Sequence, residues 1–256
     1  TTEIYTLSLH DALPIYPRWV VANQMGPNAL WLLEALLERM PIEPGAKVLD
    51  LGCGRAMTSI FLAKELGARV WATDLWIPAD DNRERIAAAG VESLVTAVHA
   101  EAHALPFAPG QFDAIVSIDA YQYFGTDDLY LGTAAGLLRD RGRIGIAVPS
   151  LAAESADGAP PPALAPFWQW EFACFHGAAW WRRHWARTGL VEVECAEAVP
   201  EAWADWLRFA RATLPHSEGW RRDDLAREIA MLEADGGAQL GFARVVARKA
   251  PAHADR

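Results

Sequence analysis

The segment VLDLGCGRAMTS, residues 48–59, constrains the fold of this chain more than any other part of the sequence. The apolar run KVLDL at 47–51 predicts a short buried strand, which leads through Gly52-Cys53-Gly54 into a helical pattern. Glycines at such a turn adopt positive φ angles and let a ligand approach the backbone closely. The helix that follows presents free N–H groups and the positive end of its dipole. The segment therefore predicts a strand–loop–helix unit with a ligand at the loop.

The rest of the chain repeats this alternation of strand and helix. Strands are expected at 47–51, 68–74, 93–100, 111–119, 143–149, 191–199 and 240–249. Helices are expected at 28–40, 57–66, 80–89 and 129–140, with a helix pair within 201–235. The strands are apolar on both faces, as in sheets that helices cover on each side. The pattern predicts an α/β fold with a doubly wound, mostly parallel sheet of seven strands.

Composition divides this single domain into segments. Residues 151–166, LAAESADGAPPPALAP, are rich in Pro, Ala and Gly, which predicts a flexible connection. The expected order is an N-terminal helical lid at 16–43, a ligand-binding core at 44–150, the flexible connection at 151–166, substrate-side helices and terminal strands at 167–249, and a tail at 250–256.

The opening stretch TTEIYTLSLHDALPI, residues 1–15, does not fit this organisation. It shows neither a helix-capping pattern nor the charged and apolar regions of a signal peptide. Its back-translation resembles a common sequencing adapter along every codon, and the last base of the adapter fits the codon of Tyr16. We therefore expect that residues 1–15 are translated adapter and that the native N-terminus is missing.

Charge and cysteine usage argue against several classes of function. The formal net charge of −10 disfavours a protein that binds nucleic-acid backbones, because such binding requires a basic surface. The longest apolar run, ALWLLEALL at 29–37, is too short to span a membrane and carries Glu34. Cys53, Cys174 and Cys195 are scattered, so they predict neither a disulfide framework nor a metal site and favour the cytoplasm.

Two classes of nucleotide-binding protein fit the glycine loop. Asp74 ends the second strand, twenty residues after Gly54, where it could bind the hydroxyls of an adenosine ribose. A nicotinamide-dependent oxidoreductase would carry a third glycine in the loop, but this position is Met57. The strand before the loop also contains an acid, Asp50. Two further motifs follow, AEAHALPF at 100–107 and QFDAIVSIDAYQYF at 111–124.

With these motifs the sequence resembles a class I S-adenosylmethionine-dependent methyltransferase, of the type-11-like branch that acts on small molecules and lipids. The strong match runs from Pro44 to Pro149, and the segments NQMGPNALWLLEALL and TDLW resemble a bacterial subgroup related to cyclopropane fatty-acid synthases. The resemblance implies a Rossmann-like methyltransferase fold with a helical, aromatic cap. It also implies S-adenosyl-L-methionine as cofactor and a small-molecule or lipid-like acceptor, without a metal.

The resemblance assigns binding roles by position in the loop and the second strand. Asp50, Gly52 and Gly54 would surround the methionine part and the ribose of the cofactor. Asp74 would bind the ribose hydroxyls, with Leu75 against the adenine.

Further roles follow from the two later motifs. AEAHALPF resembles the family signature D-A-x-x-L-P-F, whose acid contacts the adenine amine; here that acid is Glu101, followed by Ala102. Asp119 would lie near the sulfonium, and Tyr121 and Tyr123 would offer aromatic faces to its positive charge.

The acceptor pocket is expected to draw on the aromatic stretch FWQWEFACFHGAAWWRRHW at 167–185. Methyl transfer is an in-line displacement in which the protein chiefly supplies proximity and alignment, and a base is needed only where the acceptor must lose a proton. Glu171, His176 and His184 are base candidates in this stretch. The catalytic residues favoured by these arguments are Asp119, Tyr121 and His176.

Three functions remain open from the sequence. Methyl transfer to a small or lipid-like molecule is favoured. A nicotinamide-dependent oxidoreductase is disfavoured by Met57 and by the LPF signature. A non-catalytic S-adenosylmethionine-binding protein is the third, because an intact donor loop indicates binding and not turnover. The fold does not name the acceptor, and the oligomeric state is open.

Overall fold

The computed structural model describes residues 16–153 and 158–251, so the expected adapter at 1–15 lies outside the described residues. The strands are β1 (Lys47–Leu51), β2 (Arg69–Asp74), β3 (Val95–His99), β4 (Phe112–Ile118), β5 (Leu138–Leu151), β6 (Val191–Ala198) and β7 (Leu240–Lys249). The α-helices are α1 (Tyr16–Asn23), α2 (Ala29–Leu37), α3 (Met57–Leu66), α4 (Ala79–Ala88), α5 (Tyr130–Leu137), α6 (Ala178–Ala186), α7 (Ala202–Thr213) and α8 (Gly219–Asp235). Short 3₁₀ helices are η1 (Tyr121–Tyr123), η2 (Ala165–Phe167), η3 (Trp170–Cys174) and η4 (Leu214–His216).

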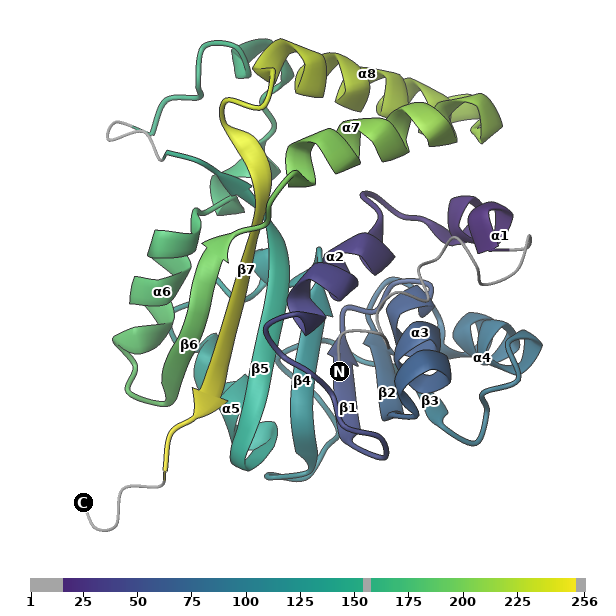
Figure 1. The fold of residues 1–256 in the computed structure, drawn as a ribbon, viewed down its shortest axis with the longest axis vertical. Helices are drawn as coiled ribbons and strands as arrows, with labels where there is room; N and C mark the ends of the chain where they lie inside the picture. Colours follow the sequence, from purple (N-terminus) through teal and green to yellow (C-terminus); the bar gives the residue numbers. More distant parts are fainter. Residues whose placement is uncertain (1–15, 154–157, 252–256) are drawn as a thin grey trace.

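The seven strands form one sheet in the order β3-β2-β1-β4-β5-β7-β6 (Figure 1). Strands β1 to β5 pair in parallel, whereas β7 runs antiparallel to both β5 and β6. This arrangement confirms the predicted doubly wound, mostly parallel sheet. The chain leaves β1 toward β2 on one side and returns to β4 on the other, and ligands bind at such a switch point beyond the carboxyl ends of the strands.

Helices cover the sheet on both faces. Helices α2, α3 and α4 pack on one face, α5 and α6 pack on the other, and α7 and α8 lie beyond the carboxyl ends of the parallel strands (Figure 1). Each face has its own apolar core, with Leu36 and Val48 in one and Trp181 and Trp185 of α6 in the other. The two faces explain why the sequence reads as apolar on both sides of each strand.

Helix ends follow the local signals in the sequence. Asn28 is the N-cap of α2, and its side-chain oxygen accepts hydrogen bonds from the backbone N–H groups of Leu30 and Trp31 at 3.1 and 3.4 Å. Gly67 ends α3 in the left-handed region, with φ at 65°. These caps fix where α2 begins and α3 ends.

The boundary between α5 and β5 differs from the prediction. A helix was expected over 129–140, but α5 ends at Leu137, and β5 begins at Leu138 and continues to Leu151. Leu138 is fully buried and pairs with Phe112 of β4, so burial and strand pairing override the helical pattern of the segment. The chain then bends at Arg141, whose φ is 60°. A register shift between β4 and β5 accompanies this bend.

A part of the expected flexible connection at 151–166 is anchored. Leu164 is fully buried against the core, and its backbone N–H bonds to the carbonyl of Pro161 at 2.9 Å. Residues 154–157 of this segment lie outside the described residues.

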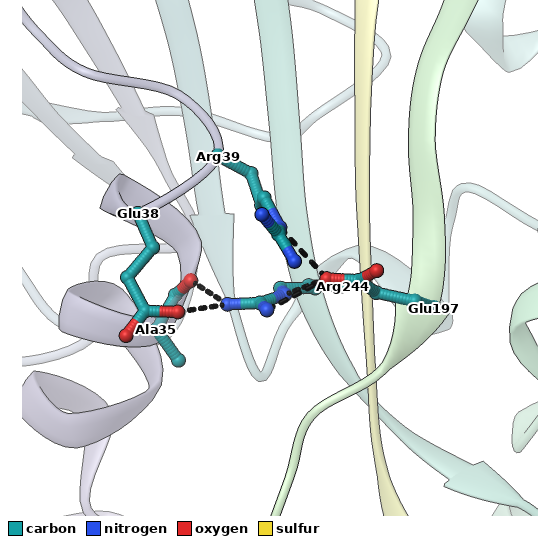
Figure 2. Close-up of polar contacts among 5 residues, drawn as sticks. All are labelled: Ala35, Glu38, Arg39, Glu197 and Arg244. Atoms are coloured by element: carbon teal, nitrogen blue, oxygen red, sulfur yellow. Dashed lines mark hydrogen bonds and ion pairs between the residues drawn. The ribbon is translucent and has the colours of Figure 1, made fainter.

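A buried arginine joins α2 to the antiparallel end of the sheet (Figure 2). Nη1 of Arg244 in β7 donates to Oε2 of Glu38 at 2.7 Å and to the carbonyl of Ala35. Its Nε and Nη2 approach Oε1 of Glu197 at 2.9 and 2.6 Å, and Arg39 donates to the same oxygen at 2.8 Å. The Ala35 carbonyl belongs to the last turn of α2, where helices leave carbonyls without an internal donor. Arg244 therefore stabilises the end of α2 and fixes it against β6 and β7.

Replacing Arg244 with Met is expected to lower the free energy of unfolding by about 2–4 kcal/mol, because the part-buried Ala35 carbonyl and two carboxylates lose their donor. Urea unfolding at pH 7 measures the loss. The matched control is Arg39→Met, since Arg39 is 49% exposed and its ion pair should contribute less than about 1 kcal/mol. Equal losses in the two variants would contradict the central role of Arg244.

Candidate functional site

A cavity of about 340 Å³ opens at the carboxyl edge of the sheet, where β1, β2 and β4 end. Its walls come from the connection between α1 and α2, the β1–α3 loop, the end of β2, residues 100–103 and the segment after β4. Segments far apart in sequence thus meet at the switch point of the sheet. The cavity is the candidate ligand site.

The glycines of the β1–α3 loop are required by close contacts. Gly52 and Gly54 have φ angles of 74° and 52°. A Cβ atom on Gly52 would lie 2.4 Å from Cβ of Ala120, a distance that no side chain could relieve without a backbone shift. A Cβ atom on Gly54 would lie 3.0 Å from the sulfur of Met25. Both glycines line the cavity and leave their backbone accessible to a ligand.

Asp50 supports this loop from below. It is fully buried, and its Oδ2 accepts hydrogen bonds from the hydroxyls of Thr58 and Ser59 at 2.6 and 2.5 Å. Burial raises the pKa of Asp50 to about 6, although the two hydroxyl bonds act in the opposite direction. Asp50 is not among the residues that line the cavity. The structure therefore places it where it positions the first turn of α3, one layer away from a bound ligand.

Asp74 joins two loops at the cavity wall. Its Oδ2 accepts from the backbone N–H of Gly54 at 2.8 Å, and its Oδ1 accepts from Trp76 and Ile77 at 2.7 and 2.9 Å. Oδ1 therefore already accepts two hydrogen bonds, whereas Oδ2 keeps one lone pair for a further donor. Leu75 also lines the cavity and is 51% exposed.

Glu101 and Ala102 form another part of the wall. His103 is paired with Glu101, with its Nδ1 2.7 Å from Oε1 and its backbone N–H donating to Oε2 at 2.8 Å. These bonds lower the pKa of Glu101. Ala102 is buried, and its carbonyl accepts from the hydroxyl of Tyr130 at 3.3 Å. The carboxylate of Glu101 is therefore kept ionised and oriented beside the cavity.

Asp119 follows β4 in a left-handed conformation, with φ at 53°. Its Oδ1 accepts from Nε2 of Gln122 at 3.3 Å, and its Oδ2 lies 3.0 Å from the place where a Cβ on Gly26 would stand. Burial, reinforced by the charge of Glu228 on α8, raises the pKa of Asp119 to about 7. The pKa of Glu228 is also raised to about 7, chiefly by burial, although its Oε1 accepts from Nε1 of Trp206 at 2.6 Å. The charge of Glu228 thus acts on Asp119, although Glu228 itself does not line the cavity.

The structure separates the predicted tyrosines. Tyr123 lines the cavity and lies against Trp76, with ring centroids 5.9 Å apart. Tyr121 is fully buried and packs edge-on against Trp181 and Trp185, with centroids 5.7 and 5.6 Å away. Tyr121 does not line the cavity, so its place in the structure is that of a core residue.

The aromatic stretch at 167–185 is divided in the same way. His176 stacks on Trp180 at a centroid distance of 3.7 Å, and it does not line the cavity. His184 is buried, and its Nε2 lies 3.0 Å from the carbonyl of Gly125. Glu171 in η3 is closer to the site, because its charge contributes to the raised pKa of Tyr123. The α6 part of the stretch belongs to the core, and η3 faces the cavity segment η1.

Two polar residues of the site carried no signal in the sequence. Asn82 of α4 is 1% exposed, and its Nδ2 donates to the carbonyl of Gly54 at 2.9 Å. Glu228 looked like any surface acid of a charged helix. Both act through contacts between elements that lie far apart in the chain, which no local pattern reveals.

The comparisons with known proteins agree with this geometry. Residues 48–142 match a protein family described as a methyltransferase domain. Over these residues the chain is therefore similar to methyltransferases. The match covers β1 to the start of β5, and it confirms the resemblance to class I S-adenosylmethionine-dependent methyltransferases.

Individual relatives match only a part of this chain. The methyltransferase GfsG of Streptomyces halstedii is 33% identical over 117 residues, which are 45% of this chain and 42% of that protein. The chain therefore matches less than half the length of this relative.

Two solved methyltransferases show the fold. Phosphoethanolamine N-methyltransferase 2 of Haemonchus contortus, in complex with S-adenosyl-L-methionine, has a TM-score of 0.75 at 18% identity, covering 91% of this chain and 56% of that one. Geranyl diphosphate C-methyltransferase of Streptomyces coelicolor has a TM-score of 0.68 at 17% identity, covering 96% and 87%. These likenesses extend the methyltransferase fold beyond the domain match to nearly the whole chain.

Other classes of site were sought in the described part of the chain. No helix there has the length and apolar character needed to cross a membrane. Within residues 16–153 and 158–251, no three or more His, Cys, Asp or Glu side chains are grouped as metal ligands.

Replacing Gly52 with Ala is expected to destabilise the protein by about 1–3 kcal/mol more than Gly45→Ala, because both glycines have positive φ but only Gly52 meets another Cβ. Urea unfolding of the two variants measures the difference. The double variant Gly52→Ala with Ala120→Gly should recover most of it. Similar stabilities of the two single variants would show that the loop does not need this close approach.

The raised pKa of Asp119 predicts a pH-dependent stability. In the unfolded chain this carboxyl ionises near pH 4, whereas in the folded protein it keeps its proton up to about pH 7. The free energy of unfolding should therefore fall as the pH rises from about 4 to 7 and then stay level. Asp119→Asn should reduce this slope and be more stable than the wild type at pH 8, with Asp140→Asn as the exposed control. An unchanged slope in Asp119→Asn would contradict the burial of an ionisable acid here.

Proposed function

We propose that this chain transfers a methyl group from S-adenosyl-L-methionine to a small-molecule or lipid-like acceptor. The observation that carries the proposal is the single cavity at which the Gly52–Gly54 loop, Asp74, Glu101 and Asp119 meet at the switch point of the sheet. The methyltransferase domain match and the solved neighbours that hold S-adenosyl-L-methionine or its demethylated product support the same donor.

The residues of the cavity fit the donor. Gly52 and Gly54 leave no Cβ between their backbone and the cavity, so a ligand can lie directly on the loop. Asp74 would accept hydrogen bonds from the ribose hydroxyls, with Leu75 against the adenine face. Glu101 would accept from the adenine amine, and the backbone of Ala102 would flank the ring. Met25, Gly26 and Pro27 line the opposite side and would cover the methionine part.

S-adenosyl-L-methionine supplies a methyl group on a positively charged sulfonium that leaves readily. The chain's own residues would align the acceptor with that group and exclude water, and alignment of this kind can contribute up to about 7–11 kcal/mol. Asp119 would lie near the positive charge, and Tyr123 would present its ring to it. In its ionised form Asp119 could also take a proton from an acceptor hydroxyl or amine. Its pKa of about 7 is suited to that task near neutral pH.

Among the predicted catalytic residues, Asp119 is favoured over the other two. Tyr121 is enclosed by aromatic rings and His176 is stacked on Trp180, and neither lines the cavity. Of the two tyrosines that the sequence suggested, Tyr123 is the one that lines the cavity. The cytoplasmic location expected from the cysteines stays a prediction.

The alternatives differ in what the cavity should bind. A nicotinamide-dependent oxidoreductase needs a loop with a third glycine, where this chain has Met57. A non-catalytic protein would bind the donor in the same way and fail to turn over. Donor binding therefore distinguishes a methyltransferase from an oxidoreductase. Methyl transfer to an identified acceptor distinguishes it from a non-catalytic binding protein.

Calorimetric titration of residues 16–256 with S-adenosyl-L-methionine is expected to show binding at one site, with no heat from NADH. Asp74→Ala should weaken donor binding at least about tenfold, since it removes the acceptor of the Gly54 N–H as well as that of the ribose. Asp80→Ala, an exposed acid at the start of α4, is the control and should bind like the wild type. Binding of NADH in place of the donor would overturn the proposal.

A further inference from the structure

The size of the cavity limits where an acceptor can bind. Its volume of about 340 Å³ lies near the lower end of the range of about 300–1,000 Å³ in which single small ligands bind. S-adenosyl-L-methionine joins an adenosine to an amino acid, so it would take up most of this space. An acceptor that reaches the methyl group would therefore bind at the mouth, against the side chains that stay exposed there.

The exposed side chains at the mouth are mostly apolar. Among the described residues, eight large apolar side chains are exposed, and four of them line this cavity: Met25, Leu75, Trp76 and Tyr123. Single exposed apolar residues are ordinary, whereas a group of them at one opening marks a binding surface. The mouth is therefore suited to an apolar part of a ligand.

Two of these side chains meet across the cavity. Trp76 follows β2 and Tyr123 follows β4, and β1 lies between these two strands in the sheet. Strands two places apart are separated by roughly 10 Å. The ring centroids of Trp76 and Tyr123 are only 5.9 Å apart, with their planes tilted by 52°. The two rings therefore lean toward each other beyond the end of β1, where the glycine loop begins.

Both rings are attached to firmly held backbone. The backbone N–H of Trp76 donates to Oδ1 of Asp74 at 2.7 Å, which fixes the short connection between β2 and α4. Tyr123 belongs to η1, whose other two residues, Tyr121 and Gln122, are fully buried. Nevertheless, the Trp76 side chain is 68% exposed. An indole held in place but left uncovered is a preorganised surface for a ligand.

We propose that Trp76 determines acceptor specificity by binding an uncharged aromatic ring of the acceptor at the mouth of the donor cavity, together with Tyr123. The proposal rests on the proposed methyl transfer, because it places the donor beneath the two rings. Aromatic rings pack in offset or edge-to-face pairs, and such pairs contribute more than the burial of their area alone. A cation would also be attracted to an indole, but here it would lie beside the positively charged sulfonium of the donor.

The test uses two uncharged probes with the same carbon skeleton, 2-naphthol and the saturated decahydro-2-naphthol. Each is titrated at pH 7 by calorimetry into the full chain saturated with S-adenosylhomocysteine, and the wild type is expected to bind 2-naphthol more tightly. Trp76→Leu keeps an apolar side chain and removes the ring. It should weaken 2-naphthol binding about three- to tenfold and change decahydro-2-naphthol binding less than about twofold. Trp76→Tyr should restore most of the affinity for 2-naphthol.

Trp220→Leu is the matched control. Trp220 of α8 is 74% exposed, like Trp76, but it does not line the cavity. This variant should bind 2-naphthol as the wild type does. Equal weakening in Trp76→Leu and Trp220→Leu would show that the probe adsorbs to exposed indoles in general, which would contradict a site at the mouth.

Other outcomes would also overturn the proposal. Loss of 2-naphthol binding on saturation with S-adenosylhomocysteine would show that the probe takes the place of the adenine. If the wild type bound decahydro-2-naphthol as tightly as 2-naphthol, or bound neither probe, the mouth would not select an aromatic ring.

A separate titration with S-adenosylhomocysteine distinguishes this proposal from the proposed methyl transfer. Trp76→Leu should bind S-adenosylhomocysteine within about twofold of the wild type, which also shows that the variant is folded. A tenfold loss would assign Trp76 to the donor and overturn its role toward the acceptor. Failure of the wild type to bind S-adenosylhomocysteine would instead count against the proposed methyl transfer.

Discussion

Two buried carboxylates hold the loop between β1 and α3, and the rest of the cavity is placed relative to that loop. Asp74 reaches across from β2 to the backbone N–H of Gly54, and Asp50 accepts the hydroxyls of Thr58 and Ser59 from the first turn of α3. Both acids are set by the parallel register of β1 and β2. The loop therefore keeps its shape without a ligand, so that its backbone is already arranged for the donor when the donor arrives.

Residues 25–27, which line the cavity, depend on a contact at the opposite end of the sheet. Arg244 of β7 fixes the last turn of α2 through Glu38 and Ala35, and Asn28 caps the first turn of the same helix. Because α2 is held at both ends, the chain segment just before it is also held in place. This segment contains Met25, Gly26 and Pro27, which line the cavity. Strands added antiparallel to the nucleotide-binding core thus help to position a segment that faces the donor.

The sequence predicted the sheet, the glycine loop and Asp74 because their signals are local: an apolar strand, a turn that needs glycine, and an acid at a strand end. It did not distinguish Tyr121 from Tyr123, because only the tertiary structure encloses Tyr121 with Trp181 and Trp185 and leaves Tyr123 at the cavity. The aromatic stretch at 167–185 suggested an acceptor pocket, but Trp181 and Trp185 of α6 pack into the core. The partners of Arg244 and Glu228 lie on other elements, at separations that no sequence window covers.

Helix α8 acts on the cavity through charge. Glu228 does not line the cavity, but its charge adds to burial in raising the pKa of Asp119 to about 7. A positively charged donor group near Asp119 would favour the ionised form of this acid. Binding of the donor would therefore be linked to the release of a proton from Asp119, which requires no change of fold.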